Sequence, residues 1–149
     1  MDELSHVDPA TGRVQMVDVG AKPQSRRRAV AQATVRMAPE TTARLRDLPK
    51  GDALATAELA GVMAAKRTSE LIPLCHQLPL SVVRVTATIG DGRVEITAEA
   101  ETVAQTGVEM EALVAASVAA LTVYDMAKAI DKQMVVEEVR LLEKRKGPA

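Results

Sequence analysis

Apolar and polar residues alternate with a strand-like period of two in several stretches of this chain. The clearest stretches run from Val30 to Met37, from Ser81 to Ile89 and from Val135 to Leu142. Asp91-Gly92 is a strong hairpin signal. The strand that follows it places a set of apolar side chains on one face: Val94, Ile96, Ala98 and Ala100. The last stretch is expected to bury Val135, Val139 and Leu141 together.

Two longer helical segments lie between these strands, with a short helix predicted over residues 40–47 ahead of them. Residues 54–67 follow Asp52, a favourable N-cap, and contain Gly61, which costs a helix about 1 kcal/mol and so indicates a close packing contact. The segment from Gly107 to Lys132 has no formal charge over residues 112–124. That uncharged run is shorter than the roughly 20 residues that cross a bilayer, so it predicts a core helix. Thr106 and Glu109 have capping-box spacing, which would start this helix near Gly107.

The order of elements is strand, helices, strand, strand, helix, strand. It predicts an α+β, ferredoxin-like β-α-β-β-α-β fold, an antiparallel sheet with helices on one face and an extra helix in the first crossover. With 149 residues, the chain is expected to form one such domain over residues 30–149. Residues 1–29 are polar and lack a sustained period, so they are interpreted as a flexible arm that contributes to the site.

Composition narrows the class of protein. Tyr124 is the only aromatic residue, so the core must be aliphatic, and a net charge of -1 gives no general attraction to nucleic acid or membrane. The single cysteine, Cys75, excludes an internal disulfide and fits a reducing compartment. The N-terminus has no apolar signal region, and a cytoplasmic protein is the expectation.

Cys75 and His76 lie on a segment where Pro73 and Pro79 forbid regular helix. No second cysteine exists and the only other histidine is His6, so no metal site is expected. His76 is interpreted either as a proton donor or acceptor, or as a histidine whose hydrogen bonds are satisfied by backbone.

Asp125 and Lys128 lie three residues apart, on one helix face at the end of the uncharged run. They are either an ordinary ion pair or an acid–base pair. Glu111 falls on nearly the same face as Asp125 but roughly 21 Å away along the helix axis, so one copy cannot bring both to a small molecule. The hypothesis is a site shared between two subunits, with Ala115, Val118 and Thr122 between the paired helices. Glu109 is assigned to the helix cap.

Positive charge is spread over Lys50, Lys66 and the run Arg26-Arg27-Arg28. The arginine run is interpreted either as a solvated basic arm or as a segment that binds phosphate groups. No phosphate-binding glycine loop or G-x-S-x-G motif is present. Taken alone, the residues indicate an acid–base enzyme that binds an anion of modest size.

Four motifs make the chain resemble a known family: MVDVGAKP, KGDALATAELAGVMAAKRTSELIPLCH, TGVEMEAL and LTVYDMAKA. They occur in order over Leu4 to Lys144 and are similar to those of the cyclic pyranopterin monophosphate synthases of molybdenum cofactor biosynthesis. Gln77 departs from the proline usual in that family, and Ala127 from a common cysteine.

The resemblance implies conversion of 3′,8-cyclo-7,8-dihydro-GTP to cyclic pyranopterin monophosphate with release of diphosphate, and no metal or organic cofactor. It also implies a hexamer, a trimer of dimers with active sites between subunits. By position, the implied catalytic residues are Asp125, Lys128, Lys50 and His76. The implied substrate-binding residues are Leu74, Cys75, His76, Met110, Glu111, Arg27, Lys22, Lys66 and Lys144.

Two other classes of protein are considered as alternatives to this family. A nucleotide- or RNA-binding ferredoxin-like module would need aromatic stacking residues on its sheet, which this chain lacks. A purely structural oligomerisation domain would not explain why Asp125 and Lys128 lie at the end of the buried run.

Overall fold

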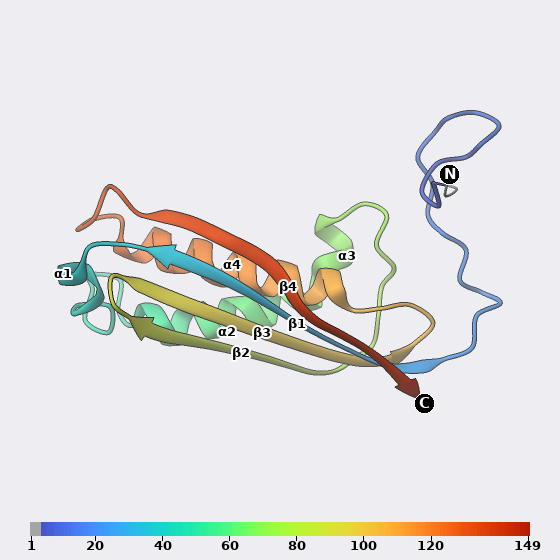
Figure 1. Ribbon diagram of the computed structural model, residues 1–149. Coiled ribbons are helices and arrows are strands. Elements are labelled where there is room, and N and C mark those ends of the chain that lie inside the picture. The colour runs from blue at the N-terminus through green and yellow to red at the C-terminus, as the bar shows by residue number, and fades with distance from the viewer. Residues whose placement is uncertain (1–3) are drawn as a thin grey trace.

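The computed structural model describes residues 4–149, which form a four-stranded sheet with the two long helices on one of its faces (Figure 1). The strands are β1 (Ser25–Arg36), β2 (Leu80–Gly90), β3 (Arg93–Ala104) and β4 (Val135–Pro148). The helices are α1 (Pro39–Thr42), α2 (Ala53–Lys66), α3 (Thr68–Leu71) and α4 (Glu109–Ala127). The strand order is β2-β3-β1-β4, with antiparallel neighbours throughout. The predicted α+β, ferredoxin-like fold is therefore confirmed.

The core between the sheet and the helices is built mainly from small aliphatic side chains. β1 and β3 place Ala29 opposite Ala100 and Ala31 opposite Ala98 on the helix-facing side, and all four are fully buried. The facing side of α4 is equally small, with fully buried Ala112, Ala115, Ala116, Ala119 and Ala120. Short side chains let helix and sheet approach closely, so a chain without Phe or Trp still forms a dense core.

The close approach predicted at Gly61 is where α2 meets α4. A Cβ atom on Gly61 would lie 3.0 Å from the carbonyl oxygen of Ala115 and 3.0 Å from a methyl group of Val85. Asp52 caps α2 as predicted, accepting hydrogen bonds from the backbone N–H groups of Leu54 and Ala55. At Gly61, therefore, α2 approaches α4 and β2 so closely that even a Cβ atom would be crowded.

Replacing Gly61 with Val should destabilise the fold by about 1–3 kcal/mol, because the added methyl groups would overlap the α4 backbone. The loss should be visible as a lower urea midpoint. Ala55→Val is the matched control, since Ala55 is exposed on the same helix and reports only the propensity cost of a β-branched residue. Equal stability of the two variants would contradict the packing interpretation.

β1 begins at Ser25, five residues before the predicted start at Val30, so the arginine run belongs to the sheet. Alternation sends neighbouring arginines to opposite faces. Arg27 is 7% exposed. Arg28 instead forms ion pairs with Glu99 and Glu143, at 2.9 and 2.8 Å.

The predicted buried face of the last strand is wrong. In β4, Val135, Val139 and Leu141 are 50%, 43% and 38% exposed. The β1–β4 pairing shifts register twice, and Glu138 has a positive φ of 55°. Each shift changes which side chains face the helices, so simple alternation fails on this edge strand.

The long helix is shorter than predicted at both ends. α4 begins at Glu109 without a side-chain cap and ends at Ala127, with Lys128 as its C-cap residue. By length and composition alone it could cross a membrane, but it packs against the sheet and α2, and ten of its residues are buried. The early helix is also shorter than predicted, covering only Pro39–Thr42.

Candidate active site

One cluster of charged side chains lies at the C-terminal end of α4. Asp125 accepts a hydrogen bond from Lys50 Nζ at 2.9 Å through Oδ2, and its Oδ1 lies 3.0 Å from Lys128 Nζ. All three side chains are about half exposed. The two ammonium groups, Lys50 before Lys128, hold the pKa of Asp125 below its ordinary value. The cluster therefore presents an ionised carboxylate and two cations to solvent.

Local structure fixes both lysines. Lys50 lies in a tight turn closed by reciprocal backbone hydrogen bonds between Leu48 and Gly51, and Gly51 has a φ of +111° that favours glycine. Lys128 continues α4, its backbone N–H donating to the carbonyl of Tyr124 at 2.9 Å. Asp131 links the neighbouring loops, accepting from Thr41 Oγ1 at 2.8 Å and from the Ala38 N–H at 3.0 Å. The sequence predicts the Asp125–Lys128 pair; the addition of Lys50 follows from the fold.

A cavity of about 200 Å³ lies at the opposite, N-terminal end of α4. Its walls are the arm, the proline-rich segment before β2 and the first turn of α4. Six predicted substrate-binding residues line it: Lys22, Leu74, Cys75, His76, Met110 and Glu111. Among its other lining residues are His6, Val17, Val19 and Glu109. The arm therefore supplies several walls that periodicity does not predict.

His76 joins the proline-rich segment to the arm. Its Nε2 lies 2.8 Å from the carbonyl oxygen of Val17, so Nε2 carries the proton and donates it. The interpretation of a histidine satisfied by backbone therefore applies to one ring nitrogen. In a neutral ring with its proton on Nε2, Nδ1 is a hydrogen-bond acceptor.

Glu109 does not cap α4, which corrects the capping-box prediction. Its Oε1 accepts a hydrogen bond from Lys144 Nζ at 3.0 Å. Burial opposes ionisation of Glu109, but its own backbone N–H, Lys144 and the charge of Arg27 outweigh it and keep its pKa below the ordinary value. Arg27 and Lys144 are thus brought together beside the cavity.

Glu111 is the most unusual group in the cavity wall. It is 4% exposed, and within residues 4–149 its Oε2 has no hydrogen-bond partner. Burial, reinforced by the charge of Glu109, raises the pKa of Glu111 to about 7. Burial and the same two carboxylates also raise the pKa of the Cys75 thiol, so Cys75 stays protonated and is not an activated nucleophile.

We expect Glu111→Gln to flatten the pH dependence of stability. With a folded pKa of about 7 against an ordinary 4.5, the folded chain keeps a proton that the unfolded chain releases. Stability of the native protein should therefore fall by about 3 kcal/mol as pH rises through this window. Urea unfolding between pH 4 and 8 measures it. Glu40→Gln, an exposed site, should leave the slope unchanged; an unchanged slope in Glu111→Gln would contradict the assignment.

Lys66 and Arg28, two of the cationic residues singled out in the sequence, lie outside both the lysine–aspartate cluster and the cavity. Lys66 is exposed at the C-terminal end of α2 and does not line the cavity. Arg28 lies on the open face of the sheet, where its charge is neutralised by carboxylates. Within the described residues, no three His, Cys, Asp or Glu side chains gather where they could hold a metal ion.

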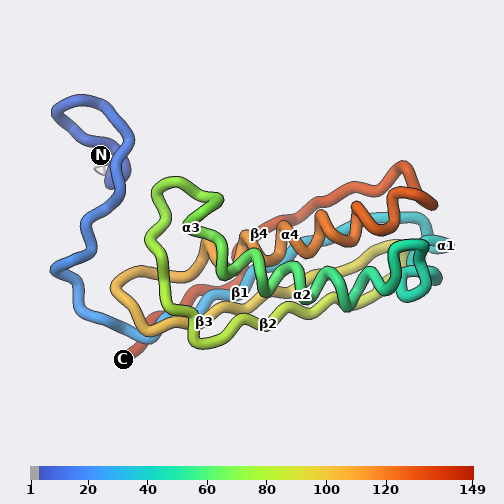
Figure 2. Tube along the Cα trace, turned by 180° about the vertical axis from the view of Figure 1, so that it is seen from behind, coloured from blue at the N-terminus to red at the C-terminus, as the bar shows by residue number. Residues whose placement is uncertain are grey.

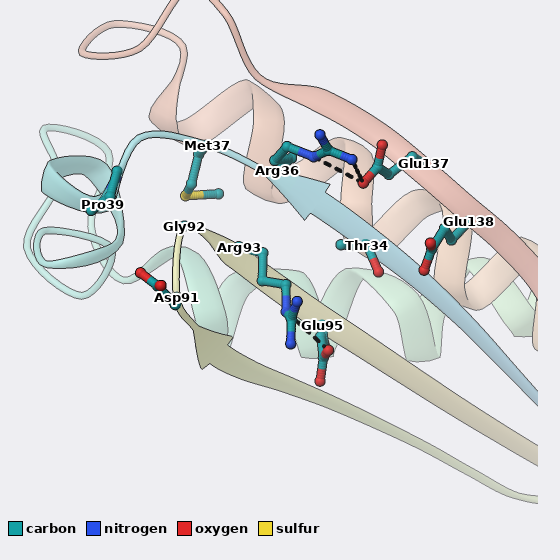
Figure 3. Close-up of a pocket in the computed structure, with 10 residues that line it drawn as sticks. All are labelled: Thr34, Arg36, Met37, Pro39, Asp91, Gly92, Arg93, Glu95, Glu137 and Glu138. Atoms are coloured by element: carbon teal, nitrogen blue, oxygen red, sulfur yellow. Dashed lines mark hydrogen bonds and ion pairs between the residues drawn. The ribbon is translucent and has the colours of Figure 1, made fainter.

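A larger hollow of about 450 Å³ lies at the hairpin end of the sheet and contains none of the predicted site residues (Figure 3). Its arginines are paired within it: Arg36 with Glu137 at 3.0 Å and Arg93 with Glu95 at 3.1 Å. These are ordinary cross-strand or surface ion pairs. The hollow is therefore not the candidate site.

The two clusters lie at opposite ends of the domain, with the arm at one end and α1 at the other (Figure 2). The fourteen-residue separation of Glu111 and Asp125 on continuous helix corresponds to roughly 21 Å. The structure also corrects the expected contact line between copies: Ala115 is fully buried beneath Gly61 within one chain. The exposed apolar residue of this helix is Leu121, one turn before Asp125.

The domain therefore carries a lysine–aspartate cluster at one end of α4 and, at the other end, a cavity whose wall includes the buried carboxyl group of Glu111. Residues 16–147 match the model of the MoaC family, and the chain belongs to that family. It is 56% identical to the cyclic pyranopterin monophosphate synthase of Roseiflexus sp. (strain RS-1), over 99% of this chain and 95% of that protein. The protein of the same name from Novosphingobium aromaticivorans is 53% identical, over 99% and 94%.

Proposed function

We propose that this protein is a lyase of molybdenum cofactor biosynthesis that converts 3′,8-cyclo-7,8-dihydro-GTP to cyclic pyranopterin monophosphate and diphosphate. The observation that carries the proposal is the carboxylate of Asp125 held between Lys50 and Lys128, in a chain more than half identical to synthases of that name. A nucleic-acid-binding module is not favoured, because the sheet displays ion pairs and no aromatic residue.

The lysine–aspartate cluster would act on the reacting atoms. Asp125, kept ionised by its neighbours, would accept protons as the starting ring system opens and return them as the new ring closes. Lys50 and Lys128 would stabilise negative charge that develops on the phosphate as a ribose-derived hydroxyl attacks the α-phosphorus and diphosphate departs.

The cavity would hold the heterocyclic end of the substrate. Its volume of about 200 Å³ is below the roughly 300–1,000 Å³ of pockets that enclose whole drug-sized ligands, so it suits one ring system. Glu111, with its unpartnered oxygen, and the Cys75–His76 segment offer polar groups to ring nitrogens and oxygens. Positive charge near this end would come from Arg27, Lys22 and Lys144. Lys66 lies outside the cavity, so it would contact only a part of the substrate, or of a neighbouring subunit, that extends beyond the cavity.

A complete site would then need two chains. The two clusters are too far apart along α4 for one substrate, and a two-fold pairing of chains would bring opposite ends of α4 together. Exposed Leu59, Met63 and Leu121 on the helices give such pairing apolar surface to bury. We propose a cytoplasmic hexamer, a trimer of dimers; a fully active monomer in sedimentation would contradict it.

The direct test is incubation of purified protein with 3′,8-cyclo-7,8-dihydro-GTP, with detection of cyclic pyranopterin monophosphate and diphosphate in equal amounts. No metal or organic cofactor should need to be added. Failure of the wild-type protein to form either product would overturn the proposed function.

A further inference from the structure

The arm carries the second histidine of the chain to the same cavity as the first. His6 and His76 both line the cavity at the N-terminal end of α4, together with Glu111. His6 also lines the adjoining apolar hollow formed with Pro73, Leu74 and Met110. The only two histidines in the sequence therefore line the same cavity, although they lie seventy positions apart along the chain.

The segment that presents His6 is a structured hairpin. Val7 and Val14 form a bridge, and the Gln15 N–H donates to the His6 carbonyl at 2.9 Å. Asp8 fixes the turn, accepting from the Ala10 N–H at 2.9 Å and from Thr11 Oγ1 at 2.8 Å. Gly12 completes it with a φ of +69°. The backbone at His6 is thereby held by the hairpin's own bonds.

The hairpin is held by its own hydrogen bonds and forms few with the rest of the domain. Among the hydrogen bonds and ion pairs of the described residues, one connects residues 4–24 to the rest of the chain: the His76–Val17 contact of 2.8 Å. Figures 1 and 2 both show the arm standing off from the proline-rich segment, on the side where α4 begins. The cavity is thus lined on one side by this lightly tethered arm and on the other by the proline-rich segment and the first turn of α4.

The wall opposite the arm contains a buried polar atom that a ligand could hydrogen-bond. Glu111 is more than nine-tenths buried, lines the cavity and has an oxygen without a partner in the described chain. A buried polar atom of this kind is costly unless something binds to it. A flat heterocycle placed against Glu111 would have its other edge or face toward the arm, where His6 and Lys22 lie.

We propose that His6 is a further substrate-binding residue, which closes the cavity over the heterocycle and hydrogen-bonds to it. The inference rests on the proposed function for the identity of the substrate. Imidazole suits this position because it offers both a donor and an acceptor nitrogen and a flat ring that can stack. Asp8 is a positioning residue that acts through the hairpin.

The test is steady-state kinetics with 3′,8-cyclo-7,8-dihydro-GTP. His6→Ala should raise KM roughly tenfold with a smaller change in kcat, the factor expected for one lost hydrogen bond of about 1.4 kcal/mol. His6→Gln, which keeps a donor and an acceptor, should recover part of the loss. Asp8→Ala should raise KM less than His6→Ala, and Asp8→Asn should restore it in part. Arg13→Ala is the matched control, because Arg13 is exposed in the same hairpin and lines neither cavity.

The outcomes separate this inference from the proposed function. If the wild-type protein forms no product, the proposed function fails whatever His6 does. If the wild type is active and His6→Ala matches it in KM and kcat, the inference is overturned. Equal losses in His6→Ala and Arg13→Ala would also overturn it, because the effect would then belong to the arm as a whole. A raised KM in His6→Ala alone, with an unchanged melting temperature, supports it.

Discussion

Replacing Asp125 with Asn should reduce turnover by roughly 10³-fold while leaving the fold intact, a loss typical of removing a general acid or base. Asn keeps the size and hydrogen-bonding shape of the side chain but cannot exchange protons near neutral pH. The side chain is half exposed, so little folding energy depends on it. The measurement is product formation under saturating substrate, with circular dichroism and melting temperature as checks on folding.

Lys128→Ala and Lys50→Ala should each also reduce turnover by orders of magnitude, since each removes one of the two cations that contact Asp125. Glu95→Gln is the matched control, because Glu95 is a similarly exposed carboxylate paired with Arg93 on the open sheet face. Wild-type rates in Asp125→Asn or Lys128→Ala would remove that residue from the catalytic cluster.

Two inactive variants should restore activity when their subunits are mixed. In a dimer of one Asp125→Asn chain and one His76→Ala chain, the intact Asp125 end of one subunit would meet the intact His76 end of the other. Random pairing makes half of the dimers mixed, each with one intact site, so activity should reach about a quarter of wild type. Co-expression of the two chains with one affinity tag common to both, followed by assay of all the purified oligomers, measures this.

The control for this experiment is a mixture of Asp125→Asn with Lys128→Ala. Both changes lie at the same end of α4, so every site in the mixed dimer stays defective and no activity should return. If mixing Asp125→Asn with His76→Ala gives only the sum of the two parents, the site lies within one chain and the shared-site proposal is wrong.

The sequence predicts the fold well where one period governs each element. Buried positions in β3 and the N-cap of α2 follow directly from alternation and residue type, and they are confirmed. The β4 faces could not be predicted, because register shifts arise from pairing with β1 and not from the strand's own pattern. The capping of α4 could not be predicted, because Glu109, a suitable cap by spacing, instead contacts Lys144 thirty-five residues away.

Some contacts of the candidate site can likewise be predicted from the sequence, and others only from the fold. Asp125 and Lys128 are paired by helical spacing alone, so sequence suffices to bring them together. Lys50 reaches Asp125, and His6 reaches the cavity, only through contacts between distant segments. The periodicity of a single segment cannot predict contacts between distant segments. The raised pKa of Glu111 likewise depends on burial, which arises only when the chain folds.

Tyr124 gives the protein a built-in optical reporter. It is the only aromatic residue in the chain, it is directly adjacent to Asp125, and its carbonyl accepts the bond that extends α4 to Lys128. With no Trp to dominate the emission, ultraviolet fluorescence of the unmodified protein comes from one ring at one known place. We therefore expect ligand binding at the lysine–aspartate cluster to change the emission of a single residue, which can be followed without a label.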